Sequence, residues 1–158
     1  MFVAVTVVVV LFILVLMWLV TPQKTGIDLS LHAVAVDDRG AAQEKGVLTL
    51  RGQKVDYQSG PDKLVAWEIG ALKQSVNPKT ADFVFHTVPD GDFEFIVGMY
   101  TDGSTGDITL VKIALATDRA WCVMAFDGPE GGLYVAAKEA DFDPNAILGK
   151  CKNIFGTN

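Results

Sequence analysis

The first twenty residues of the chain form one continuous apolar run. Met1 to Val20 contains no charge, glycine or proline, and Thr6 is its one polar residue. A helix rises 1.5 Å per residue, so such a run reaches about 30 Å, the thickness of the hydrocarbon core of a bilayer. The pattern predicts a single transmembrane anchor helix over residues 1–22, with residues 1–20 in contact with lipid.

Three features distinguish this run from a cleaved secretion signal. It has no basic leader, it is longer than a signal's apolar stretch, and no small-x-small cleavage site follows it. We therefore expect the helix to be retained, with a signal peptide as the alternative. Trp18 and Lys24 are the expected membrane-interface anchors, because indoles and cations suit the headgroup boundary. Basic residues follow the run (Lys24, Arg39 and Lys45) and none precedes it, which favours a cytoplasmic side for the remainder.

After the apolar run the hydrophobic period changes to two. Ile27, Leu29 and Leu31 alternate with Asp28 and Ser30, which predicts a half-buried strand over 27–36 within a juxtamembrane segment of residues 23–45. The alternation ends over residues 34–36, which are all apolar. Either both faces of the strand are covered there, or the register shifts.

Beyond residue 46, short β-rich runs alternate with turn signals about every twelve residues. The runs are 47–50, 54–57, 63–69, 82–88, 93–100, 108–116, 120–126 and 132–137, and the turns are 58–62, 77–80, 89–92, 101–107, 117–119 and 127–132. Residues 37–46 read as a polar loop. This spacing predicts a β-rich globular domain over 46–158, built as an antiparallel barrel or sandwich.

One amphipathic helix is expected at the end of this domain, over residues 144–155. Asp143 is a good N-cap and Pro144 suits the first helical position. The apolar positions then fall on one face, which we expect to pack on the sheet: Ile147, Leu148, Cys151, Ile154 and Phe155.

A run of about seven antiparallel strands followed by one C-terminal helix resembles the pleckstrin-homology-like superfold, over roughly residues 45–155. The stretches "VAWEIGALKQ" and "DFVFHTVPDGDFEFIV" are similar in texture to middle strands of such domains. In phosphoinositide-binding members, basic residues near the first hairpin hold the headgroup. The resemblance therefore implies lipid-headgroup or partner contacts at Lys45, Arg51 and Lys54, around "TLRGQK". The alternatives are an immunoglobulin-like or other small sandwich, with these three residues at a solvated hairpin tip.

Charge and cysteine content narrow the function classes. The chain has 13 basic and 19 acidic residues, all beyond position 20, so the net charge of -6 belongs to the β-rich part. An acidic domain repels phosphate backbones, which disfavours a nucleic-acid partner. The two cysteines, Cys122 and Cys151, form no metal-binding or redox motif, and we expect two buried apolar side chains rather than a disulfide.

No catalytic signature accompanies these elements. His32 and His86 lie in separate strands, no G-x-S-x-G elbow occurs, and the glycine-rich loops at 101–107 and 127–132 lack the context of a phosphate or calcium loop. We expect no catalytic residue, no metal and no cofactor.

These features predict a single-pass, membrane-anchored accessory or binding subunit of a larger membrane protein complex, without catalysis. In layout alone the chain resembles the H subunit of bacterial photosynthetic reaction centres and small subunits of respiratory complexes. One alternative is a membrane-tethered pleckstrin-homology-like domain that binds lipid headgroups or peptides. Others are a pilin-like filament subunit and an enzyme of unfamiliar type.

Overall fold

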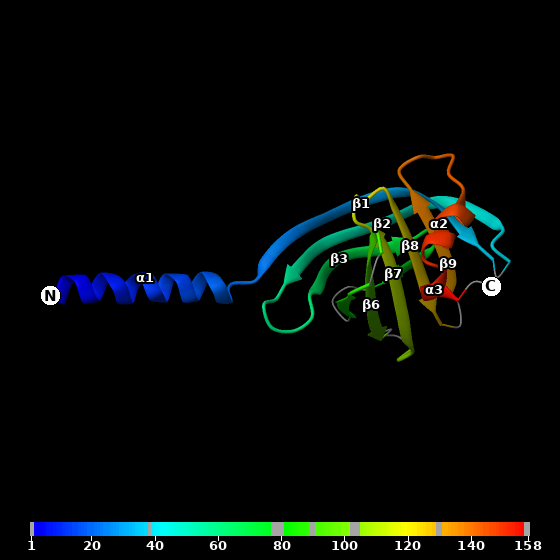
Figure 1. Ribbon diagram of the computed structural model, residues 1–158. Helices are drawn as coiled ribbons and strands as arrows, with labels where there is room; N and C mark the ends of the chain where they lie inside the picture. The colour runs from blue at the N-terminus through cyan, green and yellow to red at the C-terminus, as the bar shows by residue number, and fades with distance from the viewer. Residues whose placement is uncertain are drawn as a thin grey trace.

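A computed structural model describes residues 2–37, 39–76, 81–88, 91–101, 105–128 and 131–156, with side chains of the first helix described from Val5 onward. Within these residues an N-terminal helix leads into a β-barrel, and two short helices follow it (Figure 1). Of the expected turns, 77–80 lies outside the described residues, and 89–92, 101–107 and 127–132 lie partly outside them.

The N-terminal helix, α1 (Phe2–Val20), projects away from the barrel (Figure 1). Its described side chains, from Val5 to Val20, are all exposed. Thr21 ends the helix, since its hydroxyl donates to the Met17 carbonyl at 2.6 Å and Pro22 follows. Among the helices described, none meets the length and hydropathy that a membrane crossing requires.

Eight antiparallel strands close into a barrel. Its order is β1-β2-β3-β5-β6-β7-β8-β9, with β9 pairing back to β1, while the short β4 pairs with β3 alone among the described strands. The turn spacing predicted an antiparallel barrel or sandwich, and the structure is the barrel. The bounds are β1 (Gln23–Val36), β2 (Ala42–Asp56), β3 (Lys63–Ala71), β4 (Gln74–Val76), β5 (Ala81–His86), β6 (Phe93–Thr101), β7 (Ile108–Ala116), β8 (Trp121–Asp127) and β9 (Gly132–Ala137).

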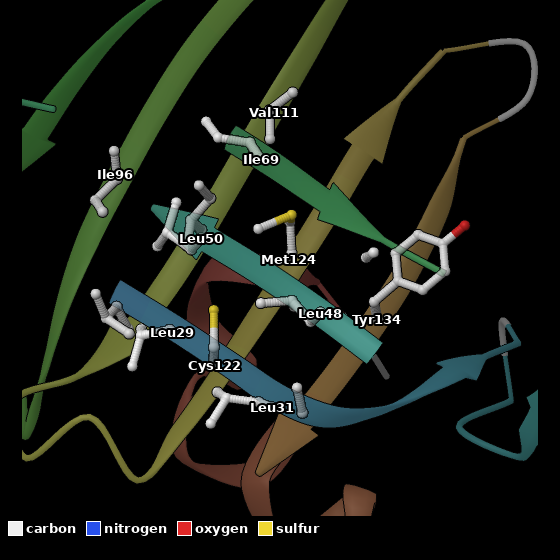
Figure 2. Close-up of a cluster of buried hydrophobic side chains, with 14 of the residues drawn as sticks. Leu29, Leu31, Leu48, Leu50, Ile69, Ile96, Val111, Cys122, Met124 and Tyr134 are labelled. Carbon is white, nitrogen blue, oxygen red and sulfur yellow. The ribbon is translucent and has the colours of Figure 1, made fainter. Parts of the chain in front are cut away.

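Apolar side chains fill the barrel interior, as Figure 2 shows for residues from β1 to β9. Leu48, Ile96 and Met124 are fully buried there. The ring of Phe83 lies against Gly98 of β6, where an added Cβ would be 2.1 Å from a ring carbon. The interior is therefore a packed core.

The first strand, β1, is one of the eight strands of the barrel. The strand predicted over 27–36 is present, begins earlier at Gln23, and pairs with β2 on one side and β9 on the other. Both interpretations of its apolar end hold: the register shifts between Val34 and Val36, and both faces are covered. Ala33 packs in the interior, whereas Val34 and Val36 pack outside.

The C-terminal helices cover the outer wall of the barrel at β8 and β9. The single helix predicted over 144–155 is instead two, α2 (Pro144–Lys150) and α3 (Lys152–Phe155), because Cys151 leaves helical geometry at φ -122° and ψ 22°. Asp143 caps α2 by accepting from Asn145 N at 2.9 Å. The predicted apolar face packs on the sheet, with Ile147, Leu148 and Cys151 buried.

Two expectations about the chain near β2 are wrong. "TLRGQK" is not a hairpin, because β2 is one continuous strand, and Gly52 permits a close approach to β3. A Cβ at Gly52 would lie 2.7 Å from the Val65 carbonyl oxygen, and the β2–β3 register shifts there. The polar loop expected over 37–46 ends at Ala41, because the Asp37 carboxylate accepts from Arg39 N and Ala41 N and forms a tight turn.

Candidate functional site

The inward side chains change from apolar to charged at one end of the barrel. Along β2, the inward face passes from Leu50 to Lys54, and along β6 it passes from Ile96 to Glu94. This end lies where β2 and β5 finish and β3 and β6 begin. We call it the polar mouth, comprising Lys54, Asp56, Asp62, Glu94 and Arg119.

Lys54 is the centre of the polar mouth. Its Nζ lies 2.7 Å from Glu94 Oε1, 3.4 Å from Asp56 Oδ1 and 3.5 Å from Asp62 Oδ2. It also lies 4.8 Å from the centre of the Phe85 ring, within cation–π range. Burial by itself lowers the pKa of Lys54, but the hydrogen bond and charge of Glu94, with the charge of Asp56, raise the pKa above its ordinary value.

Glu94 joins Lys54 to a second cation from the β7–β8 turn. Arg119 Nη1 lies 2.8 Å from Glu94 Oε2, although the two atoms are not aligned for a hydrogen bond. Arg119 has a φ of 61°, and the neighbouring Asp118 carboxylate stabilises the turn by accepting from Ala120 N. The Glu94 carboxylate thus ties β2, β6 and the β7–β8 turn together.

The loop between β2 and β3 contributes Asp62 to the polar mouth. Asp62 accepts from Tyr57 N through its side chain at 3.1 Å, and its carbonyl accepts from Phe85 N at 2.8 Å. A cleft of about 550 Å³ opens beside this loop. Its lining includes Asp62, Phe85, His86, Glu94 and Thr117.

The polar mouth pairs its charges internally. Two cations face three carboxylates, and Lys54 occupies the space between all three of those carboxylates. In the part of the chain that the structure describes, no group of three or more His, Cys, Asp or Glu side chains is arranged to hold a metal ion. This arrangement fixes strands and a turn in place.

The three basic residues singled out in the sequence lie on one strand but do not converge. Lys45 is exposed at the far end of β2, opposite Val34. Arg51 is on the outer face, where it donates to Asp28 at 2.9 Å and to Glu68 at 2.8 Å. Those two acids also raise the pKa of Arg51. Of these three basic residues, only Lys54 belongs to the polar mouth.

The two residues expected as membrane-interface anchors, and the two thiols, lie away from the polar mouth. Trp18 is 70% exposed on α1, and Lys24 is exposed on β1 opposite Val55. Cys122 and Cys151 are both free and buried, as expected, on opposite faces of the barrel wall. Burial raises the pKa of Cys122 to about 12 and that of Cys151 to about 11, so neither is a reactive thiol.

The acids and the arginine of the polar mouth were not identified from sequence. For Glu94 a signal exists, because strand alternation places it on the same face as Ile96 and Gly98, which are core positions. Arg119 and Asp62 lie in turns, whose side-chain directions no periodicity indicates.

Comparison with known proteins gives no relative from which a role could be inferred: no family model, curated protein or solved structure matches the chain.

Proposed function

We propose that this protein is a single-pass, membrane-anchored accessory or binding subunit of a larger membrane protein complex, without a catalytic role. In this proposal α1 is the anchor and the barrel is the interacting part, with the cytoplasmic side favoured by the basic residues after the helix. A photosynthetic or respiratory electron-transport complex is an example of such an assembly.

The observation that carries the proposal is the character of α1. From Val5 to Val20 it exposes apolar side chains, with Thr6 as the exception, and the sequence run begins at Met1. An exposed helix of this kind has no apolar partner in the rest of the described chain, and lipid or a membrane protein would supply one. Thr21 and Pro22 alone separate the helix from β1, which would hold the barrel at the membrane surface.

The barrel supports a binding role rather than an enzymatic one. Its interior is filled by side chains, its thiols are protonated and buried, and the charges of the polar mouth are paired. Activated nucleophiles and general bases need accessible groups with tuned pKa values. With its interior filled, the barrel would contact a partner through its outer surface.

A lipid-headgroup module, the alternative from the pleckstrin-homology-like resemblance, is less favoured. A headgroup site needs converging, uncommitted cations, whereas Arg51 and Lys54 point to opposite sides of β2 and both are paired with acids. Reversing the charges of Lys45 and Arg51, which lie outside the polar mouth, should leave binding to phosphoinositide vesicles unchanged.

Isolation of the chain from native membranes in mild detergent tests the accessory role. We expect the full chain to retain a membrane protein partner in a fixed ratio. A matched chain that carries an unrelated transmembrane helix in place of residues 1–20 separates the contribution of the barrel from that of the anchor. A chain that stays monomeric in every mild detergent would contradict the proposal.

A further inference from the structure

Among the described strands, β1 has a long stretch that is paired on one side only. This strand pairs with β2 from Gln23 onward but with β9 only from His32 to Val36. On the β9 side, the stretch Gln23–Leu31 has no strand partner among the described residues, and no described loop donates to or accepts from its backbone. We call this stretch the β1 edge.

An open edge of this length is unusual in a stable barrel. Unpaired N–H and C=O groups template pairing with another chain, and proteins commonly block them with proline, bulges or short strands. The β1 edge has no proline, and the β1 register shift lies beyond it, between Val34 and Val36. Charged side chains also discourage edge pairing, and the β1 edge carries two of them, Lys24 and Asp28.

The two faces of the β1 edge define what could lie beside it. Ile27, Leu29 and Leu31 point into the barrel and are at most 8% exposed, whereas Asp28 and Ser30 are exposed on the outer face. An added strand would therefore alternate apolar and polar side chains in the same way. Lys24 is exposed beside the start of the edge, so an acidic residue opposite it would complement the charge.

The direction of α1 argues against a second copy as the occupant. Identical edges pair around a twofold axis, which makes the two strands antiparallel. In each chain α1 leads into β1 after Thr21 and Pro22 (Figure 1). The two α1 helices of such a dimer would therefore leave the joined strands at opposite ends. Two such helices would not enter one bilayer from the same side.

We propose that the β1 edge binds an extended juxtamembrane segment of the neighbouring membrane protein, which adds to the barrel as a further strand. This inference rests on the proposed function for the source of the segment. Backbone hydrogen bonds supply the affinity, and the alternation of side chains supplies the specificity. The edge begins where α1 ends, so the segment binds as it leaves the membrane.

Hydrogen exchange of the full chain, in its detergent-solubilised complex and after dissociation, tests the proposal. We expect amides of Gln23–Leu31 that exchange quickly in the isolated chain to be protected at least tenfold in the complex. Residues 65–68 of β3 also lack a second strand partner among the described residues and are the internal control, with fast exchange in both samples. A zero-length carbodiimide crosslink from Lys24 should reach an acidic residue next to a transmembrane helix of the partner.

A pair of proline variants separates edge binding from misfolding. Neighbouring amides of a strand point to opposite sides, so one of Thr25→Pro and Gly26→Pro removes an amide from the β2 ladder and the other removes one from the β1 edge. The variant that keeps the Tm of the wild type should bind the partner at least tenfold more weakly than the wild type does. Retention of the partner by that variant would overturn the proposal.

The outcomes distinguish this inference from the proposed function. Fast exchange of Gln23–Leu31 within an intact membrane complex overturns the inference alone. Protection that appears in the isolated chain as it dimerises overturns the choice of occupant. Release of the chain from membranes by alkaline carbonate overturns the proposed function, and with it the source of the segment.

Discussion

At the scale of single residues, the polar mouth depends on Glu94. This one carboxylate contacts Lys54 at 2.7 Å and Arg119 at 2.8 Å, so its charge offsets two cations that are both less than a third exposed. Removing one partner of such a network leaves the others partly buried and uncompensated. The cost then includes the desolvation of the groups that remain.

Glu94→Gln should therefore lower the free energy of unfolding by about 1.5–3 kcal/mol, the range for hydrogen bonds to charged groups. The matched control is Glu44→Gln, which removes an exposed pair with Lys73 and should change stability by less than about 1 kcal/mol. Urea unfolding at neutral pH measures both. Equal stability of the two variants would contradict the role given to Glu94.

The difference between wild type and Glu94→Gln should also depend on pH. The pKa of Lys54 is raised in the folded protein, so its stabilising contribution is fully present below the ordinary value of 10.5 and is lost as the pH rises through the folded value. We expect the stability difference to shrink above pH 10.5. Unfolding curves of both proteins from pH 8 upward test this, and a constant difference would contradict it.

The thiols should be inert while the protein is folded. With pKa values near 12 and 11, Cys122 and Cys151 carry almost no thiolate at pH 8. We expect no labelling by a thiol reagent until denaturant unfolds the chain, and no disulfide after mild oxidation, because the two lie on opposite faces of the wall. Mass spectrometry with and without denaturant gives the count of labelled thiols.

At the scale of elements, local patterns predicted the strands from β3 to β9 well, apart from β4, because alternation and turn residues are local signals. They failed at Gly52, which predicted a turn. The glycine instead lets β2 approach the Val65 carbonyl of β3 closely, and no local pattern indicates that neighbour. The break at Cys151 was also missed, since the apolar spacing continues across it. Predicting the polar mouth requires the register between strands, and the alternation within one strand does not give that register.

Gly98→Ala tests the packing between β5 and β6. Its new Cβ would lie 2.1 Å from the fully buried Phe83 ring, and overpacking of this kind costs about 1–3 kcal/mol. The control is Gly26→Ala on β1, where no atom lies within 4 Å of the new Cβ. Chemical denaturation of the two variants should show a loss only for Gly98→Ala, and an unchanged midpoint there would be inconsistent with the core described.

At the scale of the whole molecule, closure of the barrel depends on β1, which joins β2 to β9 across most of the chain length. The sequence placed this strand in a juxtamembrane segment because nothing local indicates such a long-range pairing. The exposed apolar helix α1 is therefore joined directly to a strand of the barrel, through Thr21 and Pro22. The proposed anchor α1 and the β1 edge are therefore consecutive in the chain.

Charges placed in α1 should detach the protein from membranes. Val10→Lys together with Leu14→Lys adds two cations near the middle of the helix, each costing about 2.5–3.5 kcal/mol for membrane insertion. The control, Val10→Leu with Leu14→Val, keeps the apolar character. Fractionation of cells should find the lysine variant in the aqueous fraction with a folded barrel, and an unchanged distribution would count against the anchor.

Alkaline carbonate extraction of native membranes, with the mass of the recovered chain, tests the central claim most directly. We expect the protein in the membrane pellet, with the apolar run Met1–Val20 still attached to the barrel. Recovery from the aqueous fraction, or of a chain that has lost this run, would contradict a membrane-anchored subunit.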